Sequence, residues 1–219
     1  MAADPSSPRS AAPASHEQNP GRGGRLTLWG VAIVVLAFSV LGGHRGTHDA
    51  SGTFRAGGAT TDPAKAGQAL PHSAPTRLRI PKITVDAPFT ALVIGASGQL
   101  EPPPAGNTNL VGWYSKGVSP GEKGTSIIAG HVDTTTSAAV FANLDDLERG
   151  DRFSVERADG RTANFVVDSA ETFEKDDFPS KRVYDDAARP EVRLITCAGD
   201  YDHSAKDYTE NLVVFAHLV

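Results

Sequence analysis

The amino-acid sequence predicts a mainly β domain that follows an N-terminal transmembrane helix, and three observations indicate this architecture. Short apolar or alternating runs, separated by turn residues, recur over residues 75–219. One uncharged apolar stretch lies near the N-terminus, and only one stretch of the later chain shows helical spacing. The length of 219 residues and the hydrophobic content of 39% leave room for one ordinary domain with additional sequence.

Residues 1–24 are rich in Pro, Ser, Ala and Gly and contain almost no large apolar side chains. Such a composition cannot bury enough apolar surface to offset the entropy of ordering the chain. We therefore expect a disordered cytoplasmic leader.

Residues 25–43 are predicted to form the transmembrane anchor, because the run Leu26–Leu41 contains no charged residue and is apolar on every face. A membrane helix needs about 17 to 25 residues, so this run is close to the lower limit, and a cleaved secretory signal is the competing interpretation. A buried core helix is a third interpretation. The run exceeds the usual signal core, and Ser39–Gly43 matches a small-x-small cleavage site poorly. We favour a retained single-pass anchor, or an uncleaved signal-like segment, that contacts membrane lipid with the N-terminus inside the cell.

Residues 44–74 return to Gly, Ala, Thr, Asp and Pro, which is typical of a flexible spacer, here extracellular. The folded domain is then expected over residues 75–219, outside the cell membrane. The net charge is −5 and the chain has no long basic block, so nothing indicates nucleic acid as a partner.

The strand signals in the domain are short and numerous. The expected strands lie at residues 77–80, 110–114, 125–129, 153–156, 164–167, 192–196 and 212–218. Asp159-Gly160 is predicted to be a hairpin turn between two of them. Many short strands suit a closed barrel, in which no strand edge is left unpaired, and a β-sandwich is the main alternative.

Residues 138–147 are predicted to form a helix that packs against the core, because apolar side chains recur there at helical spacing. These side chains are Val140, Phe141, Leu144 and Leu147.

Cys197 is the only cysteine of the chain, and it ends the β-rich run Val192–Cys197. Thiols exported to an oxidising space usually form disulfides. A single cysteine behind an export segment therefore indicates either a reactive thiol or a small buried side chain, and composition leaves both interpretations open.

His131 follows the predicted strand at residues 125–129 much as Cys197 follows a later strand. A thiol needs a nearby base or cation to become a nucleophilic thiolate, and an imidazole can take up the proton and return it to a leaving amine. Two strand ends of one barrel can bring these side chains together. By residue type alone, His131 can equally be a core or surface histidine, as can His203 and His217 of the same domain.

No metal or organic cofactor is expected. His131 and Asp133 lack a third and a fourth ligand at suitable spacing. The adjacent acids Asp145-Asp146 and Asp176-Asp177 are more typical of solvated turns than of a calcium site.

The order and spacing of several short segments make the chain similar to the sortases from Thr76 to Val219. The segments are Arg79–Ile83, Val85–Pro88, Val111–Tyr114, Ala129–Asp133, Val140-Phe141, Leu144–Asp151, Lys175–Pro179, Leu194–Cys197 and Tyr208–Val214. The chain resembles the actinobacterial branch of classes E and F, and its Trp-Tyr segment and Asn-Leu-Val-Val ending favour class F.

This resemblance implies a closed eight-stranded β-barrel with one or two short helices. It also implies a membrane-anchored, extracellular cysteine transpeptidase that acts on surface proteins bearing a Leu-Pro-x-Thr-Gly-like sorting signal. Cys197 would attack the threonine carbonyl and form a thioester, and His131 would be the general acid and base. A peptidoglycan-precursor amine would then accept the acyl group.

Sortases add an arginine, usually on the final strand, that holds the substrate and stabilises charge at the attacked carbonyl. No arginine follows Cys197 in this chain. Asn211 occupies the aligned position, where its amide could donate a hydrogen bond to an oxyanion; some relatives carry a basic residue where this chain has Thr209. Arg193 is on the same face as Cys197 but about 13 Å away along the strand, and Arg182 lies in a predicted loop. Asn211 and Arg193 are therefore the oxyanion or substrate-stabilising candidates, and the third role is assigned to neither.

Two other classes of protein are alternative interpretations of this sequence. A non-catalytic wall-binding or pilus-assembly module would keep the barrel but would need neither Cys197 nor His131. An exported L,D-transpeptidase would place its histidine shortly before its cysteine in a Ser-His-Gly-Cys-like signature, which Leu194–Cys197 does not match.

Overall fold

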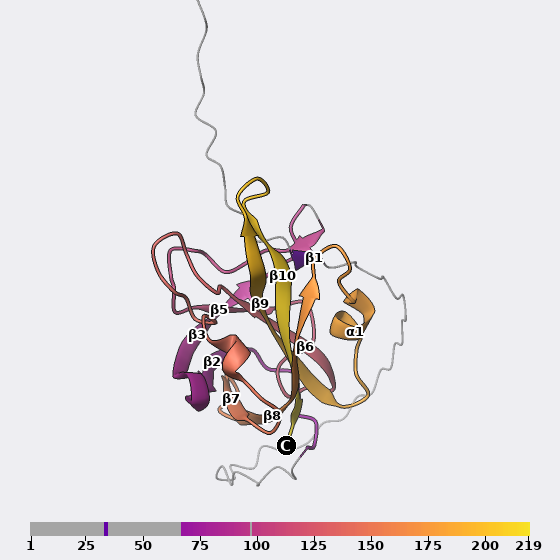
Figure 1. The fold of residues 1–219 in the computed structure, drawn as a ribbon. Coiled ribbons are helices and arrows are strands. Elements are labelled where there is room, and N and C mark those ends of the chain that lie inside the picture. Colours follow the sequence, from indigo (N-terminus) through magenta and orange to yellow (C-terminus); the bar gives the residue numbers. More distant parts are fainter. Residues whose placement is uncertain (1–32, 35–66, 97) are drawn as a thin grey trace, which may run out of the picture.

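The closed eight-stranded barrel is confirmed, and the sandwich alternative is wrong. The computed structural model describes residues 33–34, 67–96 and 98–219, and eight of its strands form one closed sheet in the order β10-β8-β7-β2-β3-β5-β6-β9 (Figure 1). These strands are β2 (Pro75–Ile80), β3 (Val85–Leu92), β5 (Val111–Tyr114), β6 (Gly124–Gly130), β7 (Arg152–Arg157), β8 (Thr162–Glu174), β9 (Pro190–Asp202) and β10 (Asp207–Leu218).

Both faces of β9 and β10 are covered, which explains their continuous apolar runs. Successive strand residues point to opposite faces of a sheet. Leu194 belongs to the cluster that fills the barrel interior, and the next residue, Ile195, belongs to a second cluster on the outer face. The short helix α1 (Ser180–Tyr184) covers this outer face, with Val183 fully buried against it (Figure 1). The sequence of a strand that is buried on both faces is apolar throughout, without alternating polar residues.

Several strands extend beyond the apolar segments that predicted them. Their backbone pairing continues into polar residues. β10 pairs with β9 as far as Asp207 opposite Asp202, and it pairs with β8 as far as Glu210 opposite Glu174. β3 was not predicted, because Asp86 interrupts its apolar pattern. Asp86 instead faces Arg79 across the antiparallel pair with β2. Backbone pairing with neighbouring strands, and not local hydrophobicity, sets these strand bounds.

The helix predicted over residues 138–147 is wrong, although its apolar side chains do pack in the core. The segment consists of turns and one 3₁₀ turn, η2 (Leu144–Asp146). The N–H groups of Ala139 and Phe141 donate to the carbonyls of Val132 and His131. Those donors anchor the segment to the chain that leaves β6, so a continuous α-helix cannot form.

Two further short elements complete the described fold, apart from a small separate sheet. The 3₁₀ turn η1 (Pro81–Ile83) connects β2 to β3. The helix α1 lies where the sequence indicated a loop around Arg182.

The predicted leader at residues 1–24 lies outside the described residues, as does nearly all of the predicted anchor at 25–43. Two anchor residues form β1 (Ile33–Val34), which pairs with β4 (Gln99–Leu100). None of the helices in the described ranges is both long enough and apolar enough to cross a membrane. The end of the predicted spacer lies against the barrel, because the Leu70 N–H donates to the Gly121 carbonyl at 2.8 Å.

Candidate active site

Two parallel neighbouring strands lead to His131 and Cys197. β6 and β9 pair in parallel, and their last matched residues are Ala129 and Ile195. Cys197 lies two residues further along β9, and His131 lies two residues further along the chain, just beyond the end of β6, so the same register continued by two residues matches them. Cys197 does not end its strand as the sequence indicated, because β9 continues to pair with β10 as far as Asp202.

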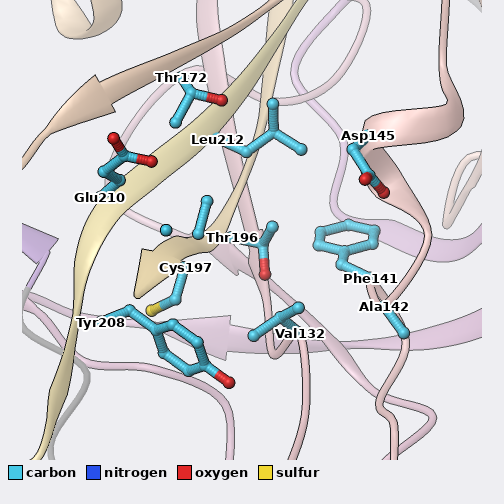
Figure 2. Close-up of a pocket in the computed structure, with 12 residues that line it drawn as sticks. Val132, Phe141, Ala142, Asp145, Thr172, Thr196, Cys197, Tyr208, Glu210 and Leu212 are labelled. Atoms are coloured by element: carbon cyan, nitrogen blue, oxygen red, sulfur yellow. The ribbon is translucent and has the colours of Figure 1, made fainter. Parts of the chain in front are cut away.

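The Cys197 side chain is buried in the wall of a cavity. It is 5% exposed and lines a cavity of about 330 Å³. Figure 2 shows its sulfur on the same side as Tyr208, with Phe141 and Asp145 on the opposite wall. Burial raises the pKa of the Cys197 thiol to about 11. The thiol of the resting protein is therefore neutral at neutral pH.

A backbone carbonyl holds the His131 ring. Nε2 lies 2.7 Å from the carbonyl oxygen of Pro103, in the loop that follows β4. A carbonyl oxygen only accepts, so Nε2 carries the hydrogen of this bond. Nδ1 of the neutral ring is then the nitrogen that can take up a proton. The ring is thus bonded to Pro103, and not to the thiol, in this structure.

Lys175 is a charged neighbour of the thiol that sequence reasoning missed as a site residue. Its Nζ lies 4.0 Å from Sγ of Cys197 and 2.7 Å from Oδ1 of Asp207. The positive charge lowers the pKa of the thiol, against the larger effect of burial, while Asp207 and Asp133 raise it. Lys175 belongs to one of the segments that resemble the sortases, but 22 residues separate it from Cys197. Only the three-dimensional arrangement of β8, β10 and β9 reveals the contact.

Asn211 lies directly opposite Cys197. The two residues are a matched pair of the antiparallel strands β10 and β9, so their side chains leave the same face with Cβ atoms about 5 Å apart. Asn211 is 2% exposed, and its Oδ1 has no hydrogen-bond partner among the described residues. A buried polar atom without a partner is unfavourable by about 1 to 3 kcal/mol.

Arg193 and Arg182 are engaged elsewhere. Arg193 is buried, forms an ion pair with Glu191 at 2.8 Å, and lies over the Phe215 ring at 4.6 Å. Arg182 contacts Glu171 with both terminal nitrogens and also lies over Phe215. Neither guanidinium is recorded in contact with the thiol, so the structure does not bring these two candidates to Cys197.

Tyr208 connects β10 to the segment that follows His131. Its hydroxyl donates to Oδ2 of Asp133 at 2.5 Å. Burial, and then this hydrogen bond, raise the pKa of Tyr208 to about 12. Since Tyr208 lines the same cavity as Cys197, this bond closes one side of the site.

Beyond Cys197, β9 has an irregularity in its pairing with β10 at Gly199, where the register shifts between Tyr208 and Glu210. Gly199 has φ of +76°, and a Cβ there would lie 2.6 Å from Oγ1 of Thr209 and 2.7 Å from Oε2 of Glu210. Only glycine fits both the dihedral angle and the space. In the described ranges, no group of three or more His, Cys, Asp or Glu side chains is arranged to hold a metal ion.

The family comparison identifies the domain. The model of the Sortase domain family matches residues 78–219, which include all of the residues described above at the cavity. The chain belongs to the sortase family. Sortases are cysteine transpeptidases, and this sortase carries a single cysteine.

The chain is similar to several solved sortase structures. Sortase C1 of Streptococcus agalactiae is 26% identical, with a TM-score of 0.50 over 66% of each chain. Sortase C-1 of Actinomyces oris is 24% identical, with a TM-score of 0.48 over 65% of this chain and 72% of its own. Sortase A of Corynebacterium diphtheriae is 22% identical, with a TM-score of 0.49 over 68% of this chain and 61% of its own. The comparison with curated protein sequences found no match.

Proposed function

We propose that this sortase is a membrane-anchored transpeptidase that cleaves a Leu-Pro-x-Thr-Gly-like sorting signal and transfers the acyl product to a cell-wall amine. One observation carries the proposal: the chain's only cysteine lines a cavity on the strand next to the one that leads to His131. A buried structural thiol needs neither the cavity nor a titratable neighbour.

Cleavage is the first half-reaction. The Cys197 thiol gives its proton to Nδ1 of His131, and Sγ attacks the threonine carbonyl carbon of the signal. The C–N bond to the following residue breaks, and the imidazolium returns the proton to the departing amine. The products are a thioester on Cys197 and the released downstream peptide.

Transfer is the second half-reaction. An amine attacks the thioester carbonyl, gives up a proton to His131, and displaces Sγ as the C–S bond breaks. The Cys197 thiolate then takes this proton from the His131 imidazolium, which restores the neutral thiol and the neutral ring. The new amide connects the surface protein to the acceptor, for which a peptidoglycan-precursor amine is the proposed chemistry.

Asn211 is the proposed hydrogen-bond donor to the oxyanion of both tetrahedral intermediates. Its buried position directly opposite Cys197 supports this role, in which Nδ2 of the amide would be the donor. A neutral amide donor costs no reorganisation when charge develops, but it supplies less electrostatic stabilisation than a guanidinium. Arg193 is the weaker candidate, because its charge is already paired with Glu191.

Location and subtype are part of the proposal. Residues 25–43 would hold the catalytic domain outside the cell membrane, where surface proteins bearing sorting signals and the acceptor are also tethered. Confinement to one surface raises the effective concentration of the reactants. Val111–Tyr114 and Asn211–Val214 support class F within the actinobacterial E and F branch.

Mass spectrometry tests the reaction. The full chain is incubated with libraries of Leu-Pro-x-Thr-Gly and Leu-Ala-x-Thr-Gly peptides, with and without an amine acceptor. We expect an acyl adduct on Cys197 that the amine removes, no adduct in Cys197→Ala, and a strongly reduced adduct in His131→Ala. The adduct mass also identifies the preferred motif.

The same experiment separates the alternatives. Peptide binding by the wild-type chain without any adduct would favour a non-catalytic wall-binding module. An adduct formed from wall stem peptides, and not from sorting peptides, would favour L,D-transpeptidase chemistry. Either result would refute the proposed function.

A further inference from the structure

The structure points to a charged partner of the nucleophile. We propose that the ammonium group of Lys175 stabilises the Cys197 thiolate in this sortase, as a catalytic cation contributed by the end of β8. The proposal rests on the proposed function and deepens it by naming the source of positive charge. No arginine follows Cys197 in the chain, so the last strand cannot supply a guanidinium.

The contact is direct and shielded from solvent. Nζ of Lys175 lies 4.0 Å from Sγ, and the lysine side chain is only 14% exposed. Because water and salt screen such a pair much less than an exposed one, the charge acts strongly on the thiolate. Cysteines beside a lysine, arginine or imidazolium are the ones that become nucleophilic near neutral pH.

The backbone fixes where the lysine lies. The Lys175 N–H donates to the Thr209 carbonyl at 3.0 Å, which extends the pairing of β8 with β10 by one residue beyond Glu174 and Glu210. On its other side, β10 pairs with β9, where Asn211 lies opposite Cys197. The lysine side chain therefore reaches over β10 to the sulfur. β10 contains no lysine or arginine of its own.

Asp207 positions the ammonium group and also opposes it. Its Oδ1 lies 2.7 Å from Nζ, which holds the lysine at the thiol. Three charged side chains act on the thiol: Lys175 favours the thiolate, and Asp207 and Asp133 disfavour it. The other titratable groups of the site are the His131 ring, the Tyr208 hydroxyl and the carboxyl groups of Asp145 and Glu210, which line the same cavity. Removing Lys175 and removing the Asp207 charge should therefore have opposite effects.

The role requires no covalent change at the lysine. When the thiol ionises, its proton goes to Nδ1 of His131, and Lys175 keeps all three of its protons. A purely structural explanation is that the Lys175–Asp207 ion pair only joins the end of β8 to the start of β10. That explanation predicts changes in stability without any change in the ionisation of Cys197.

Alkylation of the thiol by iodoacetamide separates these explanations, because Cys197 is the only cysteine. The rate is measured by mass spectrometry on the folded full chain from pH 7 to 10.5. Lys175→Met should lower the rate at pH 8 about tenfold, equivalent to a rise of about one unit in the thiol pKa. Lys175→Arg should stay within about threefold of wild type. Asp207→Asn should raise the rate, and Lys123→Met, which removes an exposed lysine charge elsewhere, should leave it unchanged.

A Lys175→Met profile that coincides with wild type would overturn the proposal, whatever happens to stability. Should that variant fail to fold, Lys175→Gln decides in the same assay, because a profile that coincides with wild type there equally contradicts the lysine role. Alkylation needs no peptide, so these results stand even where no sorting peptide is cleaved. Conversely, acylation of Cys197 by peptides together with an unaltered Lys175→Met profile would remove the lysine role and keep the proposed function.

Discussion

Raising the pH from 8 to 10 should destabilise the wild-type chain by about 1 kcal/mol more than the Cys197→Ala variant. Burial raises the pKa of the Cys197 thiol from 9.0 in the unfolded chain to about 11 in the folded state. The folded state therefore binds this proton more tightly. Its contribution to stability is fully present below pH 9 and is lost between pH 9 and 11, to a total of about 3 kcal/mol.

Urea unfolding at pH 8, 9 and 10 measures this difference. The alanine variant loses sulfur contacts at every pH, so only the change with pH reports on the thiol. Tyr184 and Tyr208 also have raised pKa values, but they titrate in both proteins and their contributions largely cancel. Parallel pH curves for the two proteins would refute the reasoning that burial keeps the Cys197 thiol neutral.

Two further substitutions test the packing around the site and the barrel. Gly130→Ala would place a Cβ 2.6 Å from the Phe141 ring at the end of β6, and overpacking should lower the free energy of unfolding by about 1 to 3 kcal/mol. Gly106→Ala, which meets nothing within 4 Å, is the control; equal effects would contradict the assigned packing. Arg157→Met should lower the free energy of unfolding by about 2 to 4 kcal/mol, because its buried guanidinium donates to two proline carbonyls that would lose their partner. The exposed Arg149→Met should change urea unfolding by less than about 0.5 kcal/mol, and a comparable loss there would refute the argument.

The barrel could be predicted because its central strands are locally apolar. The runs around Ile127, Leu194 and Val213 are buried on both faces, so they stand out from the turns that flank them. β3 could not be predicted, because Asp86 interrupts its apolar pattern and the charges that pair with Asp86 lie on the neighbouring strand β2. The helix predicted around Phe141 was wrong although the local pattern is helical. The backbone N–H groups of Ala139 and Phe141 donate to residues that directly follow β6, which the local pattern does not show.

The candidate site could be predicted from the sequence only for residues that follow an apolar run on their own strand. Cys197 and His131 each follow a recognisable apolar run, and the strands β6 and β9 that contain these runs are parallel neighbours. Lys175 gave no such signal, because a lysine after a strand is ordinary until the neighbouring strands are known. Its contact depends on β10 lying between β8 and β9, which is a property of barrel closure and not of any local pattern.

The protonation of the resting thiol determines how the proposed reaction must begin. A thiol with a pKa of about 11 is almost entirely protonated at pH 7, so a preformed thiolate–imidazolium pair would be a minor state. Ionisation from that state is unfavourable by about 5 kcal/mol at pH 7. His131 must therefore accept the proton as Sγ attacks, and any charge that favours the thiolate lowers the barrier directly. Asn211 offers only a neutral amide at this position, so the Lys175 ammonium, 4.0 Å from the sulfur, is the positive charge that we propose to lower this barrier.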